Sequence, residues 1–395
     1  MTSVSLRHRF PGVATSDQRE WARFDGPAGT QMVDTAVTAV TDWMLSGSTA
    51  AGGGAFRAAD DCDALLDRAR STVGMLLGAD PEGVSFGTNS TSNVFALSRA
   101  VGATLQPGDR IVGTRLDHDS NITPWRRAAD AAGAQQVLAD FDAATGTLPP
   151  QNVIDLIDER TKWVTLPGAS NLLGTIPDLA PIIAAAHAVG ARVFVDAVHL
   201  APHQRVDITA LGCDALTTSP YKWYGPHAGV IWIHPELRDS LPLFKVRPAS
   251  PTGPRSFETG MPNYEAIAGV EAAARFLLEE GMDHIDAAEA EVFAPLLSGL
   301  QAISGVTVYG PATMHGRTPT AAFTINGVHP AQAAEALAAA KIAVWDGHNY
   351  AVEVVDHLGL ADSGGVIRAG VVRYIEHDDV NRLLQVVERL ATTGS

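Results

Sequence analysis

The residues with the clearest chemical potential are a lysine and an aspartate that each follow a short apolar segment. Asp196 comes directly after Val193–Val195, and Lys222 follows Ala215–Thr217 within the sequence Ser-Pro-Tyr-Lys. An aspartate that ends a buried strand is either a helix N-cap or a functional carboxylate. Another apolar segment, Val230–Ile233, comes after Lys222, so we expect Lys222 in a tight turn between two strands, close to Asp196. A lysine amine in such a place can act as a nucleophile and as a general base.

Lysine is scarce in this chain, which helps to single out Lys222. The lysines stand at positions 162, 222, 245 and 341. Lys162 opens a predicted strand, Lys245 lies in a proline-bounded loop, and Lys341 is expected to end an alanine-rich helix, where a cation suits the helix dipole. A loop lysine is most often simply solvated, but Lys222 alone follows a central predicted strand near an acid.

Two further segments add groups that can hold a cofactor. Gly87-Thr88-Asn89-Ser90 follows a predicted strand and precedes a predicted helix, where backbone N–H groups either bind phosphate or are ordinarily capped. His118 follows the next predicted strand, and it either stacks on an aromatic ring or is a hydrogen-bonded loop histidine. A lysine, an acid, phosphate donors and a ring-stacking side chain are what pyridoxal 5′-phosphate (PLP) chemistry requires.

The elements that must position these residues alternate between helix and strand over residues 60–235. Short apolar strands are predicted at Val84–Phe86, Arg110–Gly113, Lys162–Leu166, Val193–Val195, Ala215–Thr217 and Val230–Ile233. Helices are predicted at Asp60–Gly78 and around 90–105, 123–133, 151–160 and 178–189. This alternation implies a mostly parallel sheet covered by helices on both faces, which binds ligands at the carboxyl ends of its strands.

A chain of 395 residues fits a large α/β domain and a smaller one. We place the large domain at 55–255, because a Pro-, Gly- and Ser-rich segment follows at 247–260. The smaller α+β domain is expected to combine residues 1–54 with residues 256–395, which begin with two predicted helices near 262–280 and 284–303.

Composition excludes several classes of function. The formal net charge of −16 disfavours binding to nucleic acid and to anionic membranes. The N-terminal residues lack the apolar core of a signal peptide, and no apolar segment reaches transmembrane length, so we expect a cytoplasmic protein. With two cysteines, the chain has no disulfide framework. His199 and His203 have a spacing seen in metal sites, but no HExxH pattern or pair of thiolates accompanies them. The expected partner is therefore a small-molecule substrate.

Several motifs resemble those of the class V aminotransferases of PLP fold type I, most closely a cysteine desulfurase-like branch related to SufS-type cysteine desulfurases. VDAVHLAPH resembles a segment that implies a bond from Asp196 to the pyridine nitrogen and a place near the phenolic oxygen for His199. SPYKWYGP resembles the Schiff-base segment, so Lys222 is implied as the covalent residue and Ser219 as a phosphate ligand. The resemblance further implies the PLP-dependent transferase fold, with a mostly parallel seven-stranded sheet, and a homodimer with active sites at the interface.

Other motifs extend the resemblance along nearly the whole chain. GTNS implies phosphate contacts for Thr88 and Asn89, and DHDSNITPW implies that His118 stacks on the cofactor ring. SNLLGT implies that Asn171 lies beside the cofactor and the substrate carboxylate. VIRAG implies that Arg368 pairs with that carboxylate, a bidentate task that suits arginine.

The chain departs from the family pattern where the desulfurases carry their nucleophilic cysteine. Their loop motif resembles RTGHHCAQP, whereas this chain reads VWDGHNYAVE and places Tyr350 at the cysteine position. A phenol cannot accept sulfur as a thiolate does. Cys213, at the start of a predicted strand, and Cys62, in the first turn of a predicted helix, are both expected to be structural.

Two smaller departures concern the lysine turn and the expected interface. Tyr221 stands where the family has a histidine before the lysine, and Met261 replaces a threonine that reaches the phosphate of the neighbouring subunit. Backbone donors at Thr259 and Gly260 are expected to keep that contact.

These observations predict a PLP-dependent enzyme that acts at the α-carbon of a small amino acid. Lys222 is expected to remove the α-proton while Asn171 and Arg368 hold the carboxylate. The favoured reaction is β-elimination by a carbon–sulfur lyase, with Tyr350 or His348 as an acid on the opposite face. The alternatives are an epimerase, an aminotransferase, a desulfurase that uses another thiol, and a non-enzymatic binding module with this fold.

Overall fold

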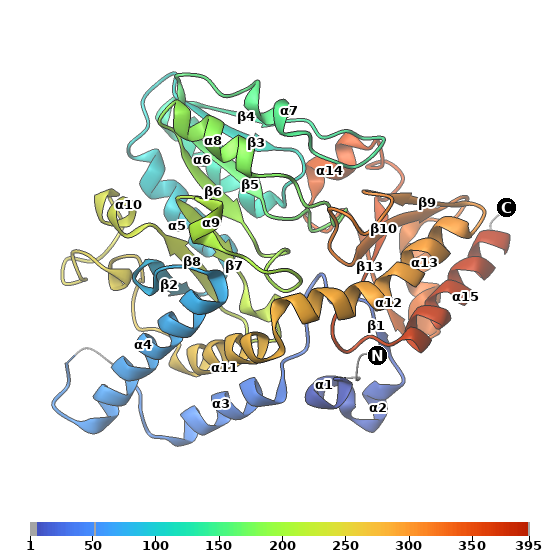
Figure 1. Cartoon of the computed structure of the whole chain (residues 1–395), viewed down its shortest axis with the longest axis horizontal. Coiled ribbons are helices and arrows are strands. Elements are labelled where there is room, and N and C mark those ends of the chain that lie inside the picture. The colour runs from blue at the N-terminus through green and yellow to red at the C-terminus, as the bar shows by residue number, and fades with distance from the viewer. Residues whose placement is uncertain (1–5, 51–52, 394–395) are drawn as a thin grey trace.

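The computed structural model describes residues 6–50 and 53–393, and its centre is a seven-stranded sheet in the order β2-β8-β7-β6-β5-β3-β4 (Figure 1). Neighbouring strands are parallel except at β8, which is antiparallel to both β7 and β2. The strands are β2 Val84–Gly87, β3 Arg110–Thr114, β4 Gln135–Ala139, β5 Thr161–Pro167, β6 Arg192–Asp196, β7 Ala215–Thr218 and β8 Gly229–Ile233. This arrangement confirms the predicted mostly parallel α/β sheet.

The central strands are buried on both faces, which explains their continuous apolar sequences. Every residue of β8 is buried, and Val193, Phe194 and Val195 of β6 are inaccessible to solvent. The helices packed around this sheet and its edges are α4 Arg57–Leu77, α5 Ser90–Gly102, α6 Thr123–Ala132, α7 Pro150–Ile154, α8 Ala180–Ala188, α9 Ile208–Leu211 and α10 Pro235–Ser240.

A smaller antiparallel sheet lies beside the main sheet, in the order β12-β13-β10-β9 (Figure 1). Its strands are β9 Val306–Tyr309, β10 Thr320–Ile325, β12 Trp345–Gly347 and β13 Val366–Gly370. The accompanying helices are α12 Met282–Ala302, α13 Pro330–Ala339, α14 Val352–His357 and α15 His377–Thr393. A two-stranded parallel sheet joins β1 Ala22–Arg23 to β11 Ile342–Ala343, so the N-terminal segment pairs with the C-terminal part of the chain.

Helix α11 connects the two regions of the chain and packs against α3 and α4. The remaining elements are α1 Pro11–Ala14, α2 Ser16–Arg19, α3 Asp34–Leu45, α11 Tyr264–Glu280 and the 3₁₀ turns η1 Arg7–Arg9, η2 Pro81–Gly83, η3 Asp119–Asn121, η4 Pro220–Lys222 and η5 Pro254–Ser256. Across the residues that the structure describes, no helix combines the length and apolar character needed to cross a bilayer.

Four details differ from the sequence prediction. Helix α7 ends at Ile154 rather than near 160, and a local turn follows in which Asp158 accepts the N–H of Arg160. The edge strand β4 was not predicted, since most of its residues are partly accessible. Helix α13 ends at Ala339, so Lys341 lies beyond it with a φ of 57°. Helix α4 begins earlier than expected, which moves Cys62 into its second turn.

Candidate active site

The structure places Lys222 at the end of η4, in the short connection between β7 and β8. Pro220 occupies the first position of this turn, where its missing N–H is not needed, and the Lys222 N–H donates to Ser219 O at 2.9 Å. The Lys222 side chain is only 8% exposed, and its amine donates a hydrogen bond to the backbone carbonyl of Pro27. The amine therefore points into the protein, away from bulk solvent.

Burial changes the acidity of Lys222 and of Asp196. Burial, together with the positive charge of Arg368 and opposed by Asp196, lowers the pKa of Lys222 to about 7. Burial raises the pKa of Asp196 to about 6, against the stabilising N–H of Val198 at 2.9 Å and the charge of Lys222. A lysine with a pKa near neutrality has the free amine that nucleophilic and general-base chemistry requires.

One cavity at the carboxyl ends of the central strands collects most of the residues singled out from the sequence. Its lining consists of Asn89, Ser90, Thr91, Asp117, His118, Ser120, Pro167, Ala169, Asn171, Asp196, Val198, His199, Ser219, Tyr221 and Lys222. These residues follow β2, β3, β5, β6 and β7, so the parallel sheet brings together segments that are far apart in the sequence.

His118 is held in one tautomer by its own loop. Its Nδ1 accepts the N–H of Ser120 at 3.0 Å and lies 2.8 Å from the Ser120 hydroxyl. Burial, together with the charges of Lys222 and Arg368, lowers the pKa of His118 to about 3. The ring is therefore neutral with its proton on Nε2. The Tyr350 ring stacks on it, with centroids 5.4 Å apart and planes inclined by 21°.

Asp117 is a fully buried carboxyl group in this cavity that sequence reasoning did not select. Thr114 Oγ1 donates to it at 2.5 Å and Asn121 Nδ2 at 2.7 Å. Burial, and the nearby charge of Asp196, raise the pKa of Asp117 well above its usual value. The available signal was its position directly before His118, at the end of a buried strand, where two carboxyl groups can approach each other.

Asn171 and Arg368 meet at the boundary between the two sheets. Arg368 Nη1 donates to the backbone carbonyl of Asn171 at 2.8 Å, and burial lowers the pKa of Arg368 to about 9. Asn171 Nδ2 donates to the carbonyl of Asn349 at 2.8 Å. Asn171 Oδ1 and Arg368 Nε are buried without a hydrogen-bond partner among the described residues, so both remain available to a ligand.

The segment that carries Tyr350 has an unusual backbone. Asn349 and Tyr350 adopt φ values of 49° and 60°, in the left-handed region that bulky residues avoid. The carbonyl of Tyr350 accepts the N–H of Asp119 at 2.8 Å, which attaches the segment to the loop of His118. The Tyr350 side chain is 66% exposed. Its phenol is thus accessible at the edge of the site.

The candidate phosphate ligands Thr88, Asn89 and Ser219 differ in whether they cap a helix and in whether they line the cavity around Lys222. Asn89 is the N-cap of α5, and its side chain accepts the N–H of Ser92 at 2.8 Å. Ser90 Oγ donates to Thr218 O at 2.8 Å and lies 2.8 Å from Ser219 Oγ. Asn89 and Ser219 both line the cavity around Lys222, whereas Thr88 is exposed and lies outside it.

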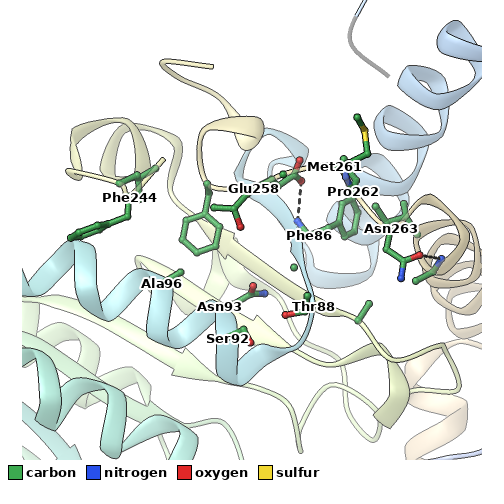
Figure 2. Close-up of a pocket in the computed structure, with 18 of the residues that line it drawn as sticks. Phe86, Thr88, Ser92, Asn93, Ala96, Phe244, Glu258, Met261, Pro262 and Asn263 are labelled. Atoms are coloured by element: carbon green, nitrogen blue, oxygen red, sulfur yellow. Dashed lines mark hydrogen bonds between the residues drawn. The ribbon is translucent and has the colours of Figure 1, made fainter. Parts of the chain in front are cut away.

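Thr88 and Gly260 line a second cavity of about 340 Å³, shown in Figure 2. Met261 borders this cavity from the segment that precedes α11. Glu258 holds the same segment in place, since it accepts the N–H of Phe86 at 3.0 Å. Within one chain, the structure therefore does not bring Gly260 and Lys222 into the same cavity.

His199 and the cysteines complete the set of predicted positions. His199 lines the cavity around Lys222, and its Nε2 lies 3.0 Å from Thr320 Oγ1. Its Nδ1 is buried without a partner among the described residues. Both cysteines are buried and free, and neither lines that cavity; burial raises the pKa of Cys213 to about 12. A buried thiol of this kind is a poor nucleophile.

These features fit PLP. A buried amine for a Schiff base, a carboxyl group suited to the pyridine nitrogen and a neutral imidazole lie in the same cavity. Three buried atoms that have no hydrogen-bond partner within the described part of the chain, His199 Nδ1, Asn171 Oδ1 and Arg368 Nε, give a polar ligand further contacts. A site with this donor set can hold the cofactor together with a carboxylate.

Comparison with known proteins agrees with this chemistry. The family model "Aminotransferase class-V" matches residues 23–383. A probable cysteine desulfurase 2 of Mycobacterium leprae is 31% identical over 390 residues, which cover 93% of this chain and 91% of that protein. An uncharacterized protein of Mycobacterium tuberculosis is also 31% identical, over 97% of this chain and 98% of its own length.

Among solved structures, the cysteine desulfurase of Thermococcus onnurineus NA1 superposes with a TM-score of 0.91 and 26% identity, covering 100% of both chains. The Escherichia coli cysteine desulfurase CsdA gives a TM-score of 0.88 and 25% identity, covering 98% of each chain. The chain thus belongs to the class V aminotransferase family of PLP-dependent enzymes and is cysteine desulfurase-like.

Proposed function

We propose that this protein is a carbon–sulfur lyase that catalyses β-elimination on a small amino acid. The observation that carries the proposal is the buried Lys222 amine, and the motif resemblance supports it, because it assigns Tyr350 to the position of the nucleophilic cysteine of desulfurases. Bound PLP withdraws electrons from the α-carbon of the amino acid and so weakens the bonds to that carbon. Loss of the cysteine removes sulfur capture and leaves that chemistry intact.

The proposed cofactor contacts follow from the cavity. Lys222 would hold PLP through a Schiff base, and Asp196 would bond to the pyridine nitrogen and keep it protonated. His118 would stack on the ring, and His199 would use its free Nδ1 near the phenolic oxygen. The phosphate would lie against Ser219 and the N-terminus of α5, with Thr88 and Asn89 as its candidate side-chain ligands.

Lys222 would act as the general base once the substrate amine has replaced it. Its pKa of about 7 means that a large fraction of the amine is unprotonated at neutral pH. Arg368 and Asn171 would hold the substrate carboxylate, because both carry buried polar atoms without a partner among the described residues. A two-point contact of this kind orients the α-proton toward the amine.

Tyr350 would supply the proton that the departing β-substituent needs. The Cα–H bond breaks as Lys222 takes the proton, and the Cβ–S bond then breaks with its electron pair on sulfur. A proton from the Tyr350 phenol, or from His348 two residues earlier, neutralises the departing thiolate. With L-cysteine as substrate, hydrolysis completes the reaction to sulfide, pyruvate and ammonia.

We also propose a cytoplasmic homodimer. Exposed apolar side chains gather on the segment that precedes α11: Phe244 is 63% exposed and Met261 is 61% exposed. An apolar surface of this kind is typical of a contact between protein chains. In such a dimer, the backbone of Thr259 and Gly260 would reach the phosphate of the second subunit, which explains why Gly260 is separate from Lys222 within one chain. The division into domains at 55–255, and at 1–54 with 256–395, remains part of this proposal.

The test is to incubate the PLP-loaded enzyme with L-cysteine and to assay sulfide and pyruvate, with Lys222→Ala as the control. Sulfide and pyruvate in equal amounts support the lyase. Sulfide with alanine would instead identify a desulfurase that uses another thiol. Exchange of the α-proton in deuterated water without pyruvate would indicate epimerisation or transamination, and no exchange with any amino acid would indicate a binding module.

A further inference from the structure

A buried carboxylate outside the cavity contacts two of the segments that carry cofactor-site residues. Glu289 lies in the middle of α12 and is 1% exposed. Tyr224 Oη donates a hydrogen bond to Glu289 Oε1 at 3.1 Å, and His203 Nδ1 lies 2.7 Å from Glu289 Oε2. A carboxylate this deeply buried requires such partners. Because Tyr224 and His203 come from different segments, Glu289 joins those segments.

The contact with Tyr224 acts on the turn that carries Lys222. Tyr224 follows Lys222 by two residues and has a φ of 69°. This conformation is strained for an aromatic residue and persists only when the surrounding structure holds it. The Tyr224 hydroxyl also accepts the N–H of Arg373 at 3.2 Å, so its own proton is directed to Glu289. Glu289 therefore anchors the far side of the Lys222 turn.

The contact with His203 acts on the segment that follows β6. Asp196 ends β6, and His199 and His203 follow in irregular backbone. The two imidazole rings lie 5.4 Å apart with planes inclined by 73°, an edge-to-face arrangement. His199 in turn lines the cavity with Lys222. The position of the His203 ring therefore limits the position of His199.

Packing alone does not account for a carboxylate at this place. An apolar side chain of similar volume usually fills a buried position at no cost in stability, whereas a buried charge must be fully satisfied. The hydrogen-bond partners of Glu289 come from two segments whose relative positions matter for the cofactor site. The sequence motifs assign Glu289 no role.

We propose that Glu289 is a positioning residue for the cofactor site, which holds the Lys222 turn through Tyr224 and His199 through His203. It does not line the cavity, so its effect reaches the cofactor through these residues. The inference uses PLP binding alone and is independent of which reaction follows.

Two substitutions test this positioning role of Glu289 without creating a large cavity in the core. Glu289→Gln replaces two acceptor oxygens with one acceptor and one donor group, so it cannot accept from both Tyr224 and His203. Tyr224→Phe keeps the ring and removes one of the two contacts. Glu289→Asp keeps the charge and serves as the conservative variant. Glu291→Gln, an exposed position on the same helix, is the matched control.

The measurements are the dissociation constant of PLP by equilibrium dialysis, the visible circular dichroism of the bound cofactor and the midpoint of its absorbance titration with pH. Glu289→Gln and Tyr224→Phe are expected to weaken PLP binding about 10-fold, as for removal of the outer partner of a metal ligand. Both are expected to change the dichroic band and the titration midpoint, Glu289→Asp to restore part of each, and Glu291→Gln to match the wild type.

The inference is overturned if both variants keep the wild-type dissociation constant, dichroic band and titration midpoint while only their thermal unfolding midpoint falls. That result would leave Glu289 as a fold residue. Should Glu289→Gln fail to fold, Tyr224→Phe decides the question by itself with the same three measurements.

Discussion

The chemistry of the site depends on a few side chains whose properties are changed by burial. Lys222, Asp196, Asp117 and Arg368 all show pKa values displaced in the direction that favours the neutral form, because each has left water. Their types, and the positions of Lys222, Asp196 and Asp117 after predicted strands, were visible in the sequence. The shifts themselves were not, since they depend on what surrounds each group.

The buried Lys222 amine predicts a pH dependence of stability in the cofactor-free protein. Its pKa is about 7 in the folded chain and 10.5 when solvated, so between these values the unfolded state binds more protons. The free energy of unfolding should therefore rise with pH between about 7 and 10.5 by more in the wild type than in Lys222→Met. Urea unfolding at several pH values measures both slopes, and equal slopes would contradict the buried neutral amine.

The Tyr350 phenol is predicted to act in turnover rather than in binding. Tyr350→Phe should lower kcat about 100-fold with little change in KM, the size expected when a general acid is removed. Tyr309→Phe, in β9 of the smaller sheet, is the control because its hydroxyl contacts Thr324 away from the cavity. Steady-state assays of pyruvate formation compare the two variants, and wild-type kinetics in Tyr350→Phe would remove Tyr350 from the mechanism.

The secondary structure shows where sequence patterns succeed and where they fail. The six predicted strands are all present, because strands buried on both faces have continuous apolar sequences. Strand β4 was missed, since it is an edge strand with partly accessible residues. Helix α7 is shorter than predicted, and residues 158–160 form a local turn instead because the Asp158 side chain accepts the N–H of Arg160.

The C-terminal end of α4 offers a test of helix termination. Gly78 has a φ of 58°, and a Cβ built there would lie 2.9 Å from Asp207. Gly78→Ala should destabilise the protein by about 1–3 kcal/mol, because it adds a steric clash to left-handed strain. Gly212→Ala is the matched control, since its φ is 74° and nothing lies within 4 Å. Denaturant unfolding of both variants should show the larger loss at Gly78, and equal losses would exclude a contribution from the clash.

The complete fold brings together chain segments that are distant in sequence. The main sheet brings Asn89, His118, Asn171, Asp196 and Lys222 together at the carboxyl ends of its strands, and the smaller sheet adds Arg368 from β13. Figure 1 shows β13 beside the main sheet rather than within it, so Arg368 reaches the site across the boundary between the two sheets.

The exposed apolar surface before α11 predicts association of two chains. A double variant, Phe244→Asp with Met261→Glu, should shift a dimer toward monomer, because two charges would be buried at the contact. Met75→Glu provides the control, since Met75 is an exposed methionine on α4. Sedimentation velocity measures the mass, and an unchanged dimer in the double variant would place the interface on another surface.

The sequence by itself determined the fold class and the family, and it predicted Lys222 as the reactive lysine. These follow from local properties: apolar strands, the residue types that follow them and short ordered motifs. Only the folded chain decided that Asp117 lies in the cavity, that Gly260 lies in a different one, and that Glu289 joins the Lys222 turn to the segment that follows β6. Contacts between distant segments depend on how the helices and sheets pack, and no spacing along the chain encodes that packing.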